Sequence, residues 1–392
     1  MKPRTYRVGI RLPDWNRGYG NRLFGGIRDF IQAGHSLALE FDQPSANYFE
    51  PVRIGADWQG DGLLVYRYSA DEAKAWRKRG IPVVNLSTEQ PDTGPRFPRV
   101  TLDNEEAGRI AAKHLGSLGV QKFAFWHDSG RQYSRERLAG FQSELANRDR
   151  ECTVLEVPAS KSPIRTRARV VAKLGLAGVS QLQAPCGLFA KDDLGGVSAI
   201  RALKTAELRC PHDVAVLGVS DDIVHCHLIS PGLSSLRFPG KRLGFTAARL
   251  LYRMMEGARV ERDFREQILS PGVVQRGSTE FVELPDPVVS QALQLIRREA
   301  PSGRLTTQLL CSQAGFSREL MRQRFQECLG RSMKQEIDRI RGEHVGEVLR
   351  QNDQALEQVA GACGFGGADE LCRFFKRVKG MTPSEWRGRY RE

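Results

Sequence analysis

The chain has 392 residues, a hydrophobic fraction of 40% and a formal net charge of +13. This length predicts more than one domain, and since no stretch approaches the roughly 18 consecutive apolar residues of a membrane span, we do not expect a transmembrane protein. The basic excess favours a polyanionic partner, but most of it lies before Asp286, so net charge alone does not show which part binds that partner.

The N-terminal part of the chain alternates strand and helix patterns. It begins directly with a strand pattern and has no apolar signal segment, so we expect a cytoplasmic protein. Strands separated by helices predict a parallel sheet with right-handed crossovers. The predicted elements are strands at 6–12, 38–41, 62–66 and 82–86 and helices at 23–31 and 71–79.

A second series of the same kind follows three prolines, Pro91, Pro95 and Pro98. Two such halves, with the chain crossing between them, predict a two-lobed binding protein whose ligand lies at the carboxyl ends of the strands. The second series comprises extended segments at 100–104 and 233–236, strands at 122–126, 154–157, 187–190 and 215–218, and helices at 106–118, 135–147, 165–174, 194–206 and 240–255.

The last ninety or so residues contain a repeat. Each run has a helical pattern, a Gly-Phe turn, a second helical pattern and a glycine stop, which predicts two helix-turn-helix units. Capping boxes at Ser332 and Thr382 start a further helix after each unit. The matching positions are Gly315, Phe316, Met321, Phe325 and Gly330 in the first unit and Gly364, Phe365, Leu371, Phe375 and Gly380 in the second.

Each unit is predicted to present a polar face at the start of its second helix. Arginine can bind guanine, glutamine can bind adenine, and a carboxylate can accept a hydrogen bond from cytosine. One such face could be an ordinary solvated helix surface, but two in the same register favour binding of DNA in the major groove. The residues are Arg318, Glu319, Arg322 and Gln323, and then Asp369, Glu370, Arg373 and Lys376.

This C-terminal region resembles the DNA-binding domain of AraC-type transcription regulators. The resemblance is carried by the segments 364–365, 375–377, 380–383 and 386–387, and it implies that the family's base-reading positions fall on Glu319, Arg322, Gln323, Asp369, Glu370 and Arg373. Two glycines depart from the family pattern. Gly342 should weaken its helix by about 1 kcal/mol relative to alanine, and Gly367 replaces a better N-cap residue.

Residues 5–280 resemble periplasmic sugar-binding proteins and LacI-type sensors. The matching segments are 82–84, 100–104, 137–141, 190–192, 211–218, 231–235 and 244–248. A LacI-type regulator carries its DNA-binding helices at the N-terminus, whereas this chain carries an AraC-type domain at its end. That pairing resembles the xylose operon regulators, whose joint between the domains is matched from Arg276 to Arg297. We therefore expect a parallel-sheet α/β sensor (1–282) followed by an all-α domain with two helix-turn-helix units (283–392).

Sugar sites combine aromatic faces with carboxylates and arginines. Candidates from loop position are Asp14, Trp15, Asp103, Trp126 and Arg137, of which the resemblance places Asp103 and Arg137 directly at sugar-contacting positions. For the aromatic residues the alternative is packing in the core, and for Arg137 it is an ordinary surface position at a helix start.

Two positions depart from the LacI-type pattern, since Lys191 replaces an asparagine and Ser220 an aspartate. If both face the ligand, the added positive charge favours an anionic sugar derivative such as a sugar acid or sugar phosphate. If instead Lys191 pairs with Asp192 or Asp193 and Asp221 takes the role of the missing aspartate, a neutral sugar is favoured. The second reading is the better supported, because carboxylates stand beside both positions.

The sequence contains none of the short motifs expected of a kinase, a zinc protease or a serine hydrolase. No cofactor is expected. The eight cysteines are interpreted as reduced thiols. The triplet His225-Cys226-His227 is too closely spaced to hold a metal ion by itself. An enzyme with an appended regulatory domain, and a DNA-binding protein indifferent to ligands, are the alternatives from other classes.

We therefore expect a DNA-binding transcription regulator controlled by a small sugar, xylose or a similar pentose. The resemblance implies an activator that acts as a homodimer on promoter DNA, with RNA polymerase as a further partner. Two units from one chain, placed in successive segments of the major groove, would read half-sites about one helical turn apart.

Overall fold

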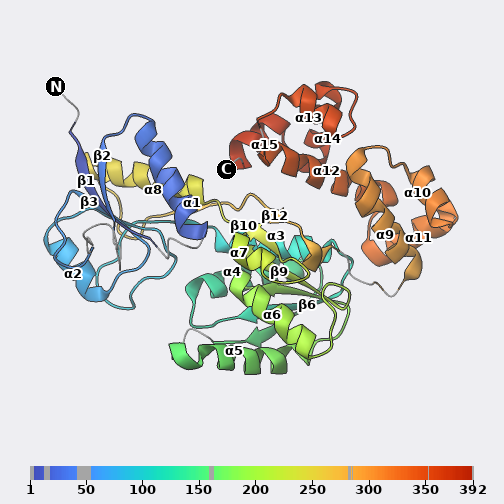
Figure 1. The fold of residues 1–392 in the computed structure, drawn as a ribbon, viewed down its shortest axis with the longest axis horizontal. Coiled ribbons are helices and arrows are strands. Elements are labelled where there is room, and N and C mark those ends of the chain that lie inside the picture. Colours follow the sequence, from blue (N-terminus) through green and yellow to red (C-terminus); the bar gives the residue numbers. More distant parts are fainter. Residues whose placement is uncertain are drawn as a thin grey trace.

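The computed structural model describes residues 4–12, 18–41, 54–158, 163–280, 284, 286–351 and 353–390. They form two α/β lobes followed by a group of helices (Figure 1). Each lobe contains a six-stranded sheet in which nearly all neighbouring strands are parallel, as the alternation of strand and helix patterns predicts. In the described part of the chain, no helix has the length and apolar character to cross a membrane.

The elements of the first lobe are β1 (Tyr6–Arg11), α1 (Gly18–Gln32), β2 (Leu37–Phe41), β3 (Gly62–Val65), α2 (Ala70–Lys78), β4 (Val83–Asn85), β5 (Arg99–Leu102), α8 (Gly240–Met255) and β11 (Arg265–Ile268). The strands follow the order β11-β5-β4-β3-β1-β2. Both faces of the sheet are covered: Leu64 packs in the core with α1 and α8, and its neighbours Leu63 and Val65 pack in the core with α2. A Cβ atom on Gly26 would lie 1.8 Å from the Lys241 carbonyl, so glycine permits the close crossing of α1 and α8.

The second lobe comprises α3 (Asn104–Gly116), β6 (Lys122–His127), α4 (Gln132–Ala146), β7 (Cys152–Glu156), α5 (Ile164–Val179), β8 (Cys186–Ala190), α6 (Asp193–Thr205), β9 (Val214–Ser220), α7 (Ile223–His227), β10 (Ser234–Arg237) and β12 (Val273–Val274). Its sheet has the order β12-β10-β9-β8-β6-β7, with β12 antiparallel to β10. Phe125 packs in the core formed with α3 and α4, whereas Ala124 and Leu188 pack toward α5 and α6.

The chain passes between the lobes three times: from β5 to α3, from β10 to α8 and from β11 to β12. The two lobes together therefore form the predicted sensor. The short elements β11, β12 and α7 were not predicted from the sequence, and a 3-10 turn, η2 (Gly277–Thr279), ends the sensor.

The C-terminal helices are α9 (Pro287–Glu299), η3 (Ala300–Ser302), α10 (Thr307–Ala314), α11 (Arg318–Leu329), α12 (Met333–Gln351), α13 (Leu356–Ala362), α14 (Ala368–Lys379) and α15 (Pro383–Tyr390). The two predicted units are α10–α11 and α13–α14, joined by the long helix α12. Met321 and Phe325 are fully buried in the core of the first unit, and Leu371 and Phe375 in that of the second. The inward faces predicted from their four-residue spacing are confirmed.

The structure accounts for both glycines that depart from the AraC-type pattern. A Cβ atom on Gly342 would lie 2.7 Å from Cγ1 of Val378, so glycine lets α12 and α14 pack closely. Gly367, at the start of α14, offers no side-chain cap. Instead the Glu357 carboxylate accepts from the Ala368 amide at 3.0 Å, and the Glu370 carboxylate accepts from the Gly366 amide at 2.8 Å.

Candidate functional sites

The second helix of the first unit presents Arg318, Glu319, Arg322 and Gln323, all exposed, along α11. Ser317 caps this helix by accepting from the Leu320 amide at 3.3 Å. Arg322 donates to Glu319 through both Nε and Nη2, at 3.1 and 2.5 Å, and this contact lowers the pKa of the Glu319 carboxyl. Arg322 is therefore held by a neighbour on its own helix.

On α14 of the second unit, Asp369, Glu370, Arg373 and Lys376 are likewise exposed. Here the carboxylate of Glu370 is engaged by the turn that precedes the helix, as described above. The two predicted base-reading faces thus lie on equivalent helices, but their carboxylates have different partners.

In the sensor, Asp14 and Trp15 lie outside the described residues. Asp103 caps α3, and its carboxylate accepts from the Glu106 amide at 2.9 Å. Trp126 is 1% exposed and belongs to the apolar core of the second lobe, where its ring lies against Gly175. Its surroundings are those of a core residue.

Arg137 is 7% exposed and lies inside the second lobe rather than on its surface. It donates to Asn104 Oδ1 at 2.9 Å and to the Lys191 carbonyl, and its guanidinium lies 4.9 Å from the centroid of the Tyr133 ring. Burial lowers its pKa, while the phenols of Tyr133 and, from α1 of the first lobe, Tyr19 act in the opposite direction. Arg137 therefore lies where side chains of both lobes meet.

Lys191 is 8% exposed and forms a compact cluster with Asp192 and Tyr133. Its ammonium lies 2.5 Å from Asp192 Oδ2 and 3.3 Å from the Tyr133 hydroxyl, which itself donates to Asp192 at 3.0 Å. Burial alone would raise the pKa of Asp192, but the Lys191 ammonium lowers it to about 2. The positive charge of Lys191 is therefore balanced within the cluster.

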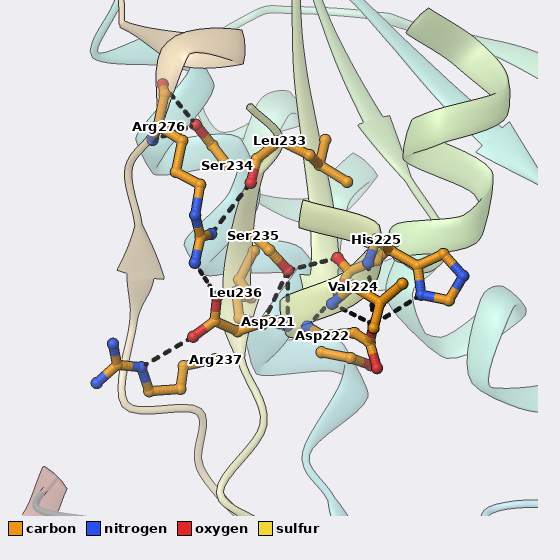
Figure 2. A network of polar contacts seen from close by, with 12 residues as sticks. Asp221, Asp222, Val224, His225, Leu233, Ser234, Ser235, Leu236, Arg237 and Arg276 are labelled. Carbon is orange, nitrogen blue, oxygen red and sulfur yellow. Dashed lines mark hydrogen bonds and ion pairs between the residues drawn. The ribbon is translucent and has the colours of Figure 1, made fainter. Parts of the chain in front are cut away.

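Ser220 and Asp221, which follow one another at the end of β9, have φ angles of 128° and 50°. Non-glycine residues rarely adopt such angles, and those that do are concentrated at functional sites. Arg22 of α1 donates to the carbonyls of both residues and so joins the two lobes here. The Asp221 carboxylate lies 2.7 Å from Arg276 Nη2 and 3.4 Å from Arg237 Nε (Figure 2).

Two family models match the chain. A periplasmic binding protein-like domain matches residues 112–279, and a helix-turn-helix domain matches residues 310–389. The xylose operon regulatory protein of Escherichia coli (strain K12) is 25% identical over 99% of this chain and 98% of that protein. The HTH-type transcriptional repressor PurR of Aliivibrio fischeri (strain ATCC 700601 / ES114) is 30% identical over 70% of this chain and 81% of that protein.

The chain is a transcription regulator of the xylose operon regulatory protein type. The same fold is found in the structure of the xylose-binding transcription activator xylR, with a TM-score of 0.59, 21% identity and full coverage of both chains. The sensor alone is similar to a LacI family regulator of Enterococcus faecium with bound ribose, with a TM-score of 0.54 and 22% identity over 71% of this chain and 99% of that one.

In this regulator the DNA-binding domain contacts the sensor at several places. Arg237, which holds Asp221, also lies 3.2 Å from Glu347 on α12. Glu347 in turn pairs with Arg350, whose guanidinium donates to the Pro271 carbonyl at 2.9 Å. A continuous series of charged contacts therefore leads from the end of β9 to the longest helix of the DNA-binding domain.

Two further contacts join the sensor to the DNA-binding domain near the start of α12. Arg331 donates to the Ser117 carbonyl at 2.5 Å. Gly119 lies so close to Leu329 and Leu284 that a Cβ atom there would approach them to 2.7 and 2.9 Å. The loop after α3 is thus seated against the first helix-turn-helix unit.

Sequence reasoning missed several residues of the regulator's sensor: Tyr19, Arg22, Tyr133 and Arg237. Tyr133 had a usable signal, because it lies four residues before Arg137 and so shares its helix face. Arg22 and Arg237 had none, because their roles depend on contacts to residues about 200 and 110 positions away.

Proposed function

We propose that a small neutral sugar, xylose or a similar pentose, binds between the two lobes and controls binding of the C-terminal domain to promoter DNA. The supporting observation is that residues near the carboxyl ends of the second lobe's strands interact with the first lobe. Arg137, which donates to the Lys191 carbonyl, interacts with Tyr19, and the Asp221 carbonyl accepts from Arg22. The Escherichia coli relative and the full-length structural neighbour both have names that refer to xylose, which agrees with this choice.

The contacts of Lys191 support a neutral ligand over an anionic one. Its charge is balanced by Asp192, so replacing the asparagine of the LacI-type pattern by lysine adds little net charge to the site. Calorimetric titration of the full chain with xylose and with xylonate tests this. We expect xylose to bind, and Lys191→Asn to leave the preference for the neutral sugar in place. Binding of xylonate that is lost in Lys191→Asn would establish the anionic reading instead.

A ligand changes DNA affinity only if it interacts differently with two arrangements of the protein. We propose that the route is Asp221 to Arg237 to Glu347, because it connects the strand end at the sugar site with α12. Glu347→Gln should keep the affinity for xylose and reduce the xylose-dependent change in DNA affinity. Asp338→Asn on the same helix, whose ion-pair partners Lys334 and Arg377 both belong to the DNA-binding domain, is the matched control. An unchanged response in Glu347→Gln would exclude this route.

We infer that the eight exposed residues of α11 and α14 face the DNA and that two copies of the chain bind one promoter as a homodimer, in contact with RNA polymerase. The site of action is then the cytoplasm, where promoter DNA lies. Since the homologues are transcription regulators, we further propose that the chain acts by binding rather than by catalysis. Footprinting and sedimentation of the complex on promoter DNA test the number of chains and the spacing of half-sites.

We place the boundary between the domains at residues 282 and 283. Leu284 is buried in the core of the first helix-turn-helix unit, and its amide donates a hydrogen bond to the Ser290 hydroxyl of α9 at 3.0 Å. A fragment of residues 283–392 should therefore fold and bind DNA without responding to xylose. An unfolded fragment, or DNA binding that survives its deletion, would show the division to be wrong.

A further inference from the structure

The joint between the sensor and the DNA-binding domain encloses a cavity of about 750 Å³. The sensor lines it with α3 and with the segment around β12, and the DNA-binding domain lines it with α9, α12, the end of α14 and Trp386 of α15. A volume of this size is typical of sites that bind small molecules. The cavity is separate from the sugar site, which lies between the lobes of the sensor.

The charged side chains of the cavity are mostly basic. Six lysines and arginines line it, against three glutamates. Two of those glutamates already have partners: Glu343 lies 2.7 Å from Arg339, and Glu347 pairs with Arg350 and Arg237. Lys379 makes no ion pair with any described residue, and its ammonium lies 5.8 Å from the centroid of the Trp386 ring. Three of the other basic side chains pair with carboxylates outside the lining: Lys113 with Glu144, Arg276 with Asp221 and Arg339 with Glu336. The positive charge offered to a ligand is therefore that of Lys379, with Arg297 lining the same cavity.

The pKa values of basic groups on both sides of the cavity are lowered by burial and by neighbouring arginines. Burial, with Arg339 acting in the same direction, lowers the pKa of Arg297 to about 10 and that of His114 to about 4. Burial, Arg339 and Arg350 also lower the pKa of Lys379, against the opposing effect of Glu343. Burial is the largest cause for all three groups, and the neighbouring arginines add a positive potential, which favours a bound anion.

We propose that this cavity binds a small organic anion with at least two negative charges, of the phosphate-ester or polycarboxylate class. Lys379 and Arg297 supply the charge that recognises it, and Trp386 and Ile340 supply apolar surface for its carbon skeleton. Because both domains line the cavity, a bound anion stabilises the docked arrangement of the sensor and the DNA-binding domain. The regulator would then respond to two signals, a sugar between the lobes and an anion at the joint.

The test uses thermal unfolding and calorimetric titration of the full chain, without DNA, with pyrophosphate and with citrate as probes. Sodium chloride at matched ionic strength is the reference. Two variants form a matched pair on α14: Lys379→Gln removes a charge from the cavity, and Lys376→Gln removes one from the exposed face. Lys379→Arg restores the charge and shows whether the first variant fails through folding.

We expect at least one probe to stabilise the wild-type chain more than the matched salt does. Lys379→Gln should weaken its binding about tenfold or more, whereas Lys376→Gln and Lys379→Arg should bind it nearly as wild type does. Equal shifts in the wild type and Lys379→Gln, or no shift beyond that of sodium chloride, would overturn the proposal. Xylose titration of the same samples keeps the outcome separate from that of the proposed sugar site, since that site and this cavity share no proposed ligand-binding residue.

Discussion

The two helix-turn-helix units are repeats of one pattern, yet the helices that follow them are anchored by different chemistry. At equivalent positions after the glycine stops, α12 carries Glu336 and α15 carries Trp386. Glu336 is 0% exposed and lies 2.6 Å from Arg331 and 2.7 Å from Arg339. Trp386 packs edge-to-face on Phe375 and donates to the Gly346 carbonyl at 3.1 Å.

This difference reflects what each unit must contact besides itself. Arg331, one partner of Glu336, also binds the Ser117 carbonyl of the sensor, so the buried carboxylate orients a side chain that joins the domains. Trp386 closes the apolar core of the second unit and lines the cavity at the joint. A repeat can therefore keep its backbone while one copy is adapted to hold a charge and the other an aromatic ring.

Removing the carboxylate of Glu336 should have the largest effect. Glu336→Ala leaves two arginines next to each other without their shared partner, and breaking such a buried pair costs about 3–5 kcal/mol. Urea unfolding of the full chain, or of the fragment 283–392, measures the loss. Lys334→Ala, on the exposed side of the same helix, is the control and should stay within about 0.5 kcal/mol of wild type. A loss for Glu336→Ala as small as that of the control would mean that the arginines find other partners.

The same carboxylate predicts a pH dependence that Trp386, at the equivalent position after the second unit, cannot supply. Burial alone would raise the pKa of Glu336, but Arg339 and Arg331 lower it from 4.5 to about 2. Because the folded state has the lower pKa, the stabilisation is complete above about pH 4.5 and is lost as the pH falls toward about 2, by on the order of 3 kcal/mol. Unfolding of wild type and Glu336→Gln across this range should show a flatter profile for the variant. Parallel profiles would contradict the assignment.

The exposed faces of α11 and α14 can be compared through the DNA bases that each is proposed to contact. Arg322→Ala should weaken binding to the specific promoter site about ten- to hundredfold through one guanine, with little loss on random DNA. Arg373→Ala, at the position equivalent to Gln323, is the corresponding change in the second unit and should relax specificity at a different base pair. Competition binding with both DNAs distinguishes this from phosphate contact, for which specific and random DNA would be weakened equally.

The smallest expected difference concerns the start of the second helix in each unit. Ser317→Ala removes a local cap and should cost about 1 kcal/mol. Glu357→Ala removes the distant carboxylate that binds the Ala368 amide and should cost about 0.5–1 kcal/mol. Thermal unfolding of the two variants side by side measures the ratio. If Glu357→Ala leaves the stability unchanged, the hydrogen bond from the Ala368 amide to Glu357 does not stabilise the start of α14.

Much of this architecture was predictable because it depends on local patterns. The inward pairs Met321–Phe325 and Leu371–Phe375 follow from four-residue spacing, and the sensor strands from short apolar runs between helices. The edge strands β11 and β12 were not predicted, because β11 reads Arg-Glu-Gln-Ile and β12 has only two residues. Their pairing is decided by neighbours far away in the chain.

The candidate sites also contain some features that depend on local patterns and others that depend on tertiary packing. The exposed positions on α11 and α14 follow from helical periodicity, and all eight are exposed as expected. The burial of Trp126, the cluster of Lys191 with Asp192 and Tyr133, and the contact of Arg237 with Glu347 depend on tertiary packing. Gly342 shows the limit of propensity arguments, since the sequence indicates only a weaker helix, whereas the structure shows that a larger residue would meet Val378.

The order of strands in the first lobe also has a consequence for synthesis of the protein. Strand β5 pairs on one side with β4 and on the other with β11, which follows more than 150 residues later, after nearly the whole second lobe. Until the ribosome has delivered Arg265–Ile268, β5 remains an open edge, and open edges invite pairing with other chains. Nascent or truncated chains that end before this strand are therefore the forms of the protein most exposed to aggregation, whereas the DNA-binding helices emerge only after the sheet is closed.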